Sequence, residues 1–129
     1  MPNHRISWGR ILAAGLLAEV ALILAIVPVG LRLGDAFLRY AAPPGSFMTC
    51  FFGALWLGRR IQSRFVLQGT LVGAVAALIY VLVSGFQPEP PAYIIAHVLK
   101  LAGGAAGGWM VQRRAANVSR WSASMSVRR

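Results

Sequence analysis

The sequence from Pro91 to Val111, PAYIIAHVLKLAGGAAGGWMV, is apolar over a length that can cross a lipid bilayer as a helix. It nevertheless carries His97 and Lys100 near its middle. Ionisable side chains at that depth are costly beside lipid, so they face the interior of a helix bundle. The stretch therefore predicts one helix of a membrane protein that has a polar centre.

The polar and small residues of this stretch share one side of a helix that advances by about 100° per residue. They are Tyr93, His97, Lys100, Gly104 and Gly108, with Gly107 at the edge. Glycines four residues apart let two helices approach closely. Such pairs are Gly103 with Gly107, Gly104 with Gly108 and, in another apolar segment, Gly69 with Gly73. We interpret them as helix-packing positions; the alternative is a site where a ligand touches the backbone.

The composition places the chain among membrane proteins. Its 129 residues allow one domain, 57% of them are hydrophobic and only 12% are charged. The net charge of +10 does not indicate a nucleic-acid-binding protein, because the charges form short clusters between apolar runs. The only cysteine, Cys50, lies inside an apolar run, so an intrachain disulfide and a cysteine metal site are both excluded.

Four apolar segments predict an all-α fold, an integral membrane four-helix bundle over residues 11–111. The expected spans are residues 11–30, 45–61, 65–86 and 91–111. Residues 45–61 are the weakest, and a re-entrant segment is the alternative there. We expect a short interfacial helix within residues 31–42 and a break at Pro43-Pro44-Gly45. Residues 1–10 form a short cytoplasmic start, and the basic tail 112–129 is expected to be disordered or to lie on the membrane surface.

The arginines predict the orientation of the bundle. Ten of them lie in the N-terminal segment, the middle loop and the tail, against two, Arg32 and Arg39, in the other loops. Positive residues concentrate on the cytoplasmic side, so both termini are expected there. Trp8, Trp56 and Trp109 would mark the cytoplasmic interface.

The depths of the charged residues predict an ion pair. Glu19 lies about 12 Å into the first span, Lys100 about 16 Å into the fourth, and His97 about 21 Å. Pairing is the least costly way to hold both charges in the membrane. We therefore expect spans one and four to touch, with Glu19 bonded to Lys100, His97 close by and Gly15 easing the approach. The pair is either structural or part of a protonatable or ligand-binding centre; Lys100 reaching the cytoplasmic interface unpaired is a third reading.

Nothing in the sequence indicates an enzyme. It contains no nucleophile elbow, no HExxH pair, no phosphate loop and no dinucleotide fingerprint. One His, one Lys and one Glu make a poor ligand set, so we expect no metal and no cofactor. His4 is terminal and too far away.

Two resemblances follow from these motifs. HVLKLAGGAAGG and the PPGSF turn resemble the small four-span bacterial inner-membrane proteins of unassigned function, which implies a bacterial inner-membrane location. The run Leu17-Ala18-Glu19-Val20 resembles the part of the small multidrug resistance exporters that holds their essential membrane carboxylate. That resemblance implies that protons and a cationic substrate compete at Glu19. The chain departs from those exporters in its strong charge bias, its long first outer loop and the absence of their substrate-site tryptophan.

We expect a non-enzymatic protein with a structural or interaction role in the lipid bilayer. It would associate with itself or with a membrane-protein partner through Gly69 and Gly73 or through Gly104 and Gly108. The alternative is a proton-coupled transporter of small molecules that uses Glu19, with His97 and Lys100 lining the path. The sequence leaves the substrate, the partner and the number of subunits open.

Overall fold

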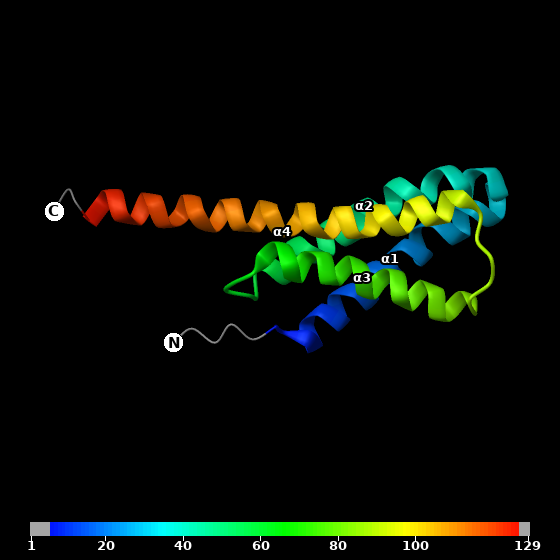
Figure 1. The fold of residues 1–129 in the computed structure, drawn as a ribbon. Coiled ribbons are helices and arrows are strands. Elements are labelled where there is room, and N and C mark those ends of the chain that lie inside the picture. The colour runs from blue at the N-terminus through cyan, green and yellow to red at the C-terminus, as the bar shows by residue number, and fades with distance from the viewer. Residues whose placement is uncertain (1–5, 127–129) are drawn as a thin grey trace.

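The computed structural model describes residues 6–126, which form four α-helices. They are α1 (Trp8–Leu33), α2 (Asp35–Gly58), α3 (Phe65–Ser84) and α4 (Pro91–Ser126), shown in Figure 1. The outer ends of the expected N-terminal segment and basic tail, residues 1–5 and 127–129, lie outside the described residues. The prediction of an all-helical chain of four helices is confirmed. Three helices, α1, α3 and α4, are long and apolar enough to cross a membrane.

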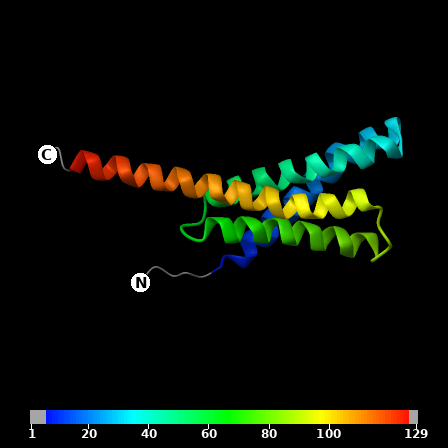
Figure 2. The same cartoon turned by 45° about the horizontal axis from the view of Figure 1, so that its top comes forward.

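The four helices form two hairpins packed side by side. Gly34 alone separates α1 from α2, and its φ of +87° belongs to a region that favours glycine. α1 and α4 each contact α2 and α3 but have no backbone contact with one another. They therefore occupy opposite corners of the bundle, and the contact expected between the first and last spans is made by side chains and not by neighbouring backbones. Figure 2 shows that α1 begins and α4 ends at the same end of the bundle.

The second helix is longer than the sequence predicted. Instead of an interfacial helix, a break at Pro43 and Pro44 and a span over 45–61, α2 runs unbroken from Asp35 to Gly58. The two prolines leave two carbonyls of the preceding turn without amide donors, which membrane helices tolerate where their neighbours support them. Gly45 lies against Leu22 and Ile26 of α1 and provides that close support. A continuous helix also does not match the re-entrant alternative.

The fourth helix continues well beyond the bundle. Residues 112–126, expected to be disordered or on the membrane surface, extend α4 in a straight line (Figure 1). Every residue from 112 to 125 is exposed. The helix is already nucleated inside the bundle, and no Gly or Pro follows Met110, so each further residue only has to propagate it. We call residues 112–126 the α4 extension.

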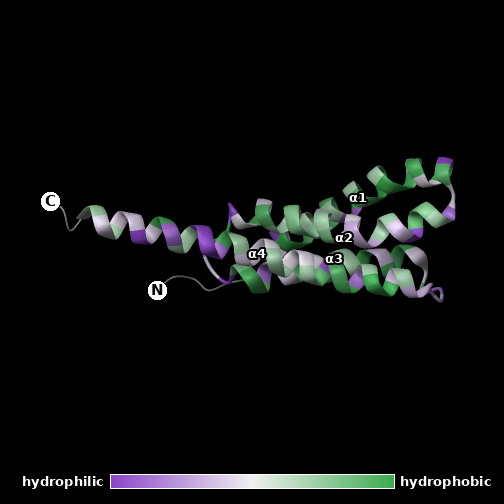
Figure 3. Ribbon diagram, turned by 90° about the horizontal axis from the view of Figure 1, so that it is seen from above, coloured by the Kyte–Doolittle hydropathy of each residue, from purple (hydrophilic) through white to green (hydrophobic). Residues whose placement is uncertain are grey.

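The arginines gather at one end of the bundle. Arg10, Arg59, Arg60 and Arg64 lie at or near the helix ends there, and Arg113 and Arg114 follow on α4. We call this the basic end, and the opposite end, with Gly34 and the loop 85–90, the far end. In Figure 3 the hydrophilic colours concentrate in the α4 extension and at the helix ends.

Candidate functional site

The centre of the bundle holds a buried ion pair between opposite helices. The Lys100 ammonium of α4 donates a 2.7 Å hydrogen bond to Glu19 Oε2 of α1. Both residues are only 2% exposed. The long side chains cross the space between two helices whose backbones do not meet. The structure thus brings together the two charges that the depth argument paired, by side-chain reach rather than by helix contact.

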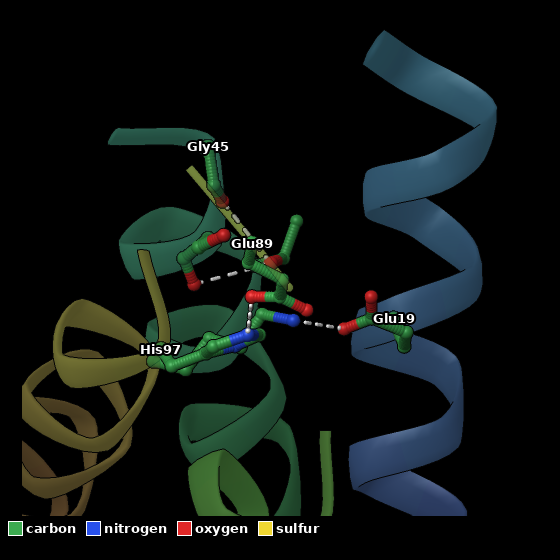
Figure 4. Close-up of polar contacts among 7 residues, drawn as sticks. Glu19, Gly45, Glu89 and His97 are labelled. Atoms are coloured by element: carbon green, nitrogen blue, oxygen red, sulfur yellow. Dashed lines mark hydrogen bonds and ion pairs between the residues drawn. The ribbon is translucent and has the colours of Figure 1, made fainter. Parts of the chain in front are cut away.

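His97, expected only to lie close to the Glu19–Lys100 pair, has a partner of its own in Glu89. Its Nε2 lies 2.9 Å from Glu89 Oε2, which belongs to the short loop before α4 (Figure 4). These two side chains are 21% and 15% exposed, so this pair lies nearer the far end and is partly open. The sequence reasoning gave Glu89 no role. The sequence does contain a signal for this contact. Glu89 lies in the short loop directly before α4, and His97 follows eight residues later on that helix, so the Glu89 carboxylate must stay close to its first turns.

Tyr80 of α3 connects the two pairs. The Lys100 ammonium lies 4.9 Å from the centroid of the Tyr80 ring, a cation–π contact. The His97 ring centroid lies 5.1 Å from that of Tyr80, and the Tyr93 ring stacks on Tyr80 with 6.1 Å between the centroids. Polar and aromatic groups therefore continue from Glu89 to His97, Tyr80, Lys100 and Glu19.

Four buried side-chain atoms have no hydrogen-bond partner within the described residues: Glu19 Oε1, Ser46 Oγ, Gln68 Oε1 and His97 Nδ1. An unpaired buried acceptor is costly in a medium of low dielectric constant. Glu19 therefore keeps one carboxylate oxygen free to accept a proton or another donor, which is the chemical capacity of this centre.

A dry core closes the centre toward the basic end. Ile11, Leu57 and Val72 are fully buried and pack together with Ala14. At the next level Ala18, Cys50 and Ala76 form a second buried cluster. The polar groups of the two pairs continue toward the far end, whereas toward the basic end these apolar residues lie between Glu19 and the buried Gln68 of α3.

The glycine pairs form close contacts between helices of the same chain. A Cβ at Gly104 would overlap the Gly69 carbonyl oxygen, and one at Gly73 would overlap the Lys100 carbonyl oxygen. Gly108 likewise lies on the Phe65 carbonyl, so this face of α4 packs on α3. Gly103 and Gly107 pack on the backbone of α2 at Phe47 and Phe51.

All six predicted glycines are buried within the chain: Gly69, Gly73, Gly103, Gly104, Gly107 and Gly108. The expectation that these faces bind a second copy or a partner is therefore wrong. Gly15 also lies elsewhere than expected, since it packs on Val72 and Val75 of α3.

Among the described residues, no group of three His, Cys, Asp or Glu side chains is placed to hold a metal ion. What the site offers is two acid–base pairs joined by an aromatic ring. This arrangement can fix charge or move a proton.

A family described as "Protein of unknown function (DUF3792)" matches residues 4–110. The matched region takes in α1, α2, α3 and the part of α4 inside the bundle, and it ends just before the α4 extension. No curated protein and no solved structure matches the chain.

Proposed function

The chain belongs to the DUF3792 family of proteins of unknown function, and we propose that it is a four-span inner-membrane protein with a structural or interaction role. Three apolar helices support this, together with α2, which packs along them over 24 residues. In this proposal the protein lies in the lipid bilayer of a bacterial inner membrane and has no enzymatic activity.

The charge distribution supports an orientation with both termini in the cytoplasm. The basic end carries Arg10, Arg59, Arg60, Arg64, Arg113 and Arg114 without an acidic residue beside them in sequence. The far end balances Arg32 and Arg39 with Asp35 and Glu89. This asymmetry supports a cytoplasmic location for the basic end.

The orientation has a direct test. Ser122→Cys on the α4 extension and Ala36→Cys at the far end both replace exposed residues. In intact spheroplasts, a membrane-impermeant maleimide should label the second variant and reach the first only after lysis. The reverse pattern would overturn the orientation.

The sealed Glu19–Lys100 pair is the observation that carries the structural role. The pair lies at 2% exposure and joins two helices that no backbone contact holds together. Removing either charge would leave the other unpaired, so the pair fixes the relative depth of α1 and α4. The bundle then holds α4 at a defined height and angle.

The α4 extension is the part that this bundle would present to a partner. Val118, Trp121 and Met125 follow one another along one side of it, and they are 70%, 71% and 62% exposed. Large apolar side chains exposed in series mark an interaction surface. A partner would find there an apolar stripe on a rigid support.

The alternative function is a proton-coupled transporter that uses Glu19, as the resemblance to small multidrug resistance exporters implies. The free Glu19 Oε1 favours it, because a proton could bind there. Two features oppose it. Lys100 already neutralises the carboxylate and would repel a cationic substrate, and the apolar core of Ile11, Leu57 and Val72 lies between Glu19 and the basic end.

Carbodiimide labelling of Glu19 in membranes distinguishes these roles, because the reagent attacks protonated carboxyl groups in apolar surroundings. The structural role predicts resistance in the native chain at neutral pH and labelling once Lys100→Met removes the partner. Lys100→Arg, which keeps the charge, is the matched control and should remain resistant. Ready labelling of the native chain would contradict the structural role and favour the transporter.

A further inference from the structure

A groove of about 550 Å³ lies between α2 and α4 where the α4 extension leaves the bundle. Phe51, Ala106 and Met110 line its apolar part, and Arg113, Arg114 and Asn117 line its polar part. The Arg113 guanidinium lies 4.4 Å above the ring of Trp109, which also borders the groove. None of these residues belongs to the buried polar centre.

The two parts of the groove follow one another along α4. Ala106 is near the bundle interior and Asn117 is about 16 Å further toward the cytoplasm at 1.5 Å per residue. Aromatic and apolar side chains thus lie at membrane depth, and two guanidinium groups lie at the interface beside a tryptophan. A phospholipid has the same order of parts, with acyl chains deeper than its phosphate.

The two arginines have no acidic partner among residues 6–126. The sequence holds only three acidic residues. Glu19 is bonded to Lys100, Glu89 faces His97, and Asp35 begins α2 at the far end. Among residues 6–126 no arginine forms an ion pair. Arg113 and Arg114 are therefore not neutralised by any side chain of residues 6–126, and an anion of another molecule can pair with them.

We propose that this groove binds one anionic phospholipid of the cytoplasmic leaflet, with an acyl chain along Phe51, Ala106 and Met110. Its phosphate accepts hydrogen bonds from Arg113, Arg114 and Asn117. Guanidinium groups suit this ligand because their planar donor forks match phosphate oxygens. The site rests on the proposed membrane insertion and orientation, which place the basic end at the leaflet richer in anionic lipid.

The test uses the full chain in a non-ionic detergent, with lipid binding followed by native mass spectrometry. Phosphatidylglycerol, phosphatidylcholine and inorganic phosphate are the three probes. Arg113→Gln with Arg114→Gln removes the cationic part of the groove. Arg32→Gln with Arg39→Gln removes the same charge from exposed residues of the far end. Ala106→Phe fills the apolar part, and Ala102→Phe adds the same bulk at an exposed position of α4.

The native chain should bind phosphatidylglycerol in preference to phosphatidylcholine and should not bind inorganic phosphate measurably. The Arg113/Arg114 variant should lose about 30-fold in affinity, which corresponds to about 1 kcal/mol for each arginine. Ala106→Phe should lose affinity as well, while both controls stay within about twofold of the native chain.

Equal losses in the two arginine variants would overturn the site, because they would mean that only net charge matters. Tight binding of inorganic phosphate would replace the lipid with a soluble anion, and equal binding of phosphatidylcholine would overturn the preference for an anionic lipid, because that lipid carries the phosphate without a net negative charge. This assay in detergent does not depend on orientation. Failure of the proposed topology would appear in the maleimide labelling, and failure of the lipid site would appear here.

Discussion

Lys100 Nζ lies 2.7 Å from Glu19 Oε2 although α1 and α4, which carry these residues, make no backbone contact. The ion pair is thus the direct link across one diagonal of the bundle. Its strength depends on burial, because water is excluded from both groups at 2% exposure. The same burial makes each charge costly once its partner is lost, so the pair can be tested by removing its members singly and together.

Lys100→Met should lower the free energy of unfolding by about 3 kcal/mol, because Glu19 is left buried without a partner. Adding Glu19→Gln should recover most of that loss, since neither charge then remains. Unfolding in mixed detergent micelles, read by circular dichroism, measures all four members of the cycle. Additive losses in the double variant would show that the two residues act independently.

The sequence could predict the helices because apolar runs of membrane length allow few other structures. It also predicted which two charges meet, since depth along the membrane follows from the rise per residue. Depth does not say which helices are neighbours around the bundle. Lys100 reaches across the diagonal, so the two spans meet through these side chains although their backbones are not neighbours.

Two predictions from the sequence are wrong for the same physical reason: the break at Pro43 and Pro44, and the state of residues 112–126. Pro43 and Pro44 predict a break by local preference, but support from α1 lets α2 continue through them. The α4 extension has no apolar periodicity strong enough to predict a helix by itself, and it inherits its nucleus from the bundle. Both depend on neighbouring structure, which local residue preferences do not contain.

Gly104→Ala should destabilise the bundle by roughly 1–3 kcal/mol, because the added methyl group meets the backbone of Gly69 rather than a movable side chain. Gly9→Ala is the matched control, since nothing lies within 4 Å of its Cβ position. That variant should be neutral or more stable by up to about 1 kcal/mol. Thermal unfolding in detergent compares them, and equal effects would contradict the close packing of α3 on α4.

Deletion of residues 119–129 should leave the stability of the bundle unchanged. Residues 119–125 are all exposed, so their loss removes no buried contact. Circular dichroism should show fewer helical residues, while the unfolding transition stays at the same temperature. A lower transition temperature would mean that the α4 extension packs against the bundle or against a second copy of the chain.

Glu89→Gln should cost at most about 1 kcal/mol, far less than Lys100→Met, although both variants break an ion pair. The Glu89 and His97 side chains are 15% and 21% exposed, so water at the far end can solvate the histidine that remains. Glutamine also keeps the size of the side chain and can still accept a hydrogen bond from the ring. Unfolding of the two variants under identical detergent conditions gives the comparison. A loss in Glu89→Gln as large as that in Lys100→Met would show that the far end is sealed as tightly as the centre, and that the polar groups from Glu89 to Glu19 form one closed network.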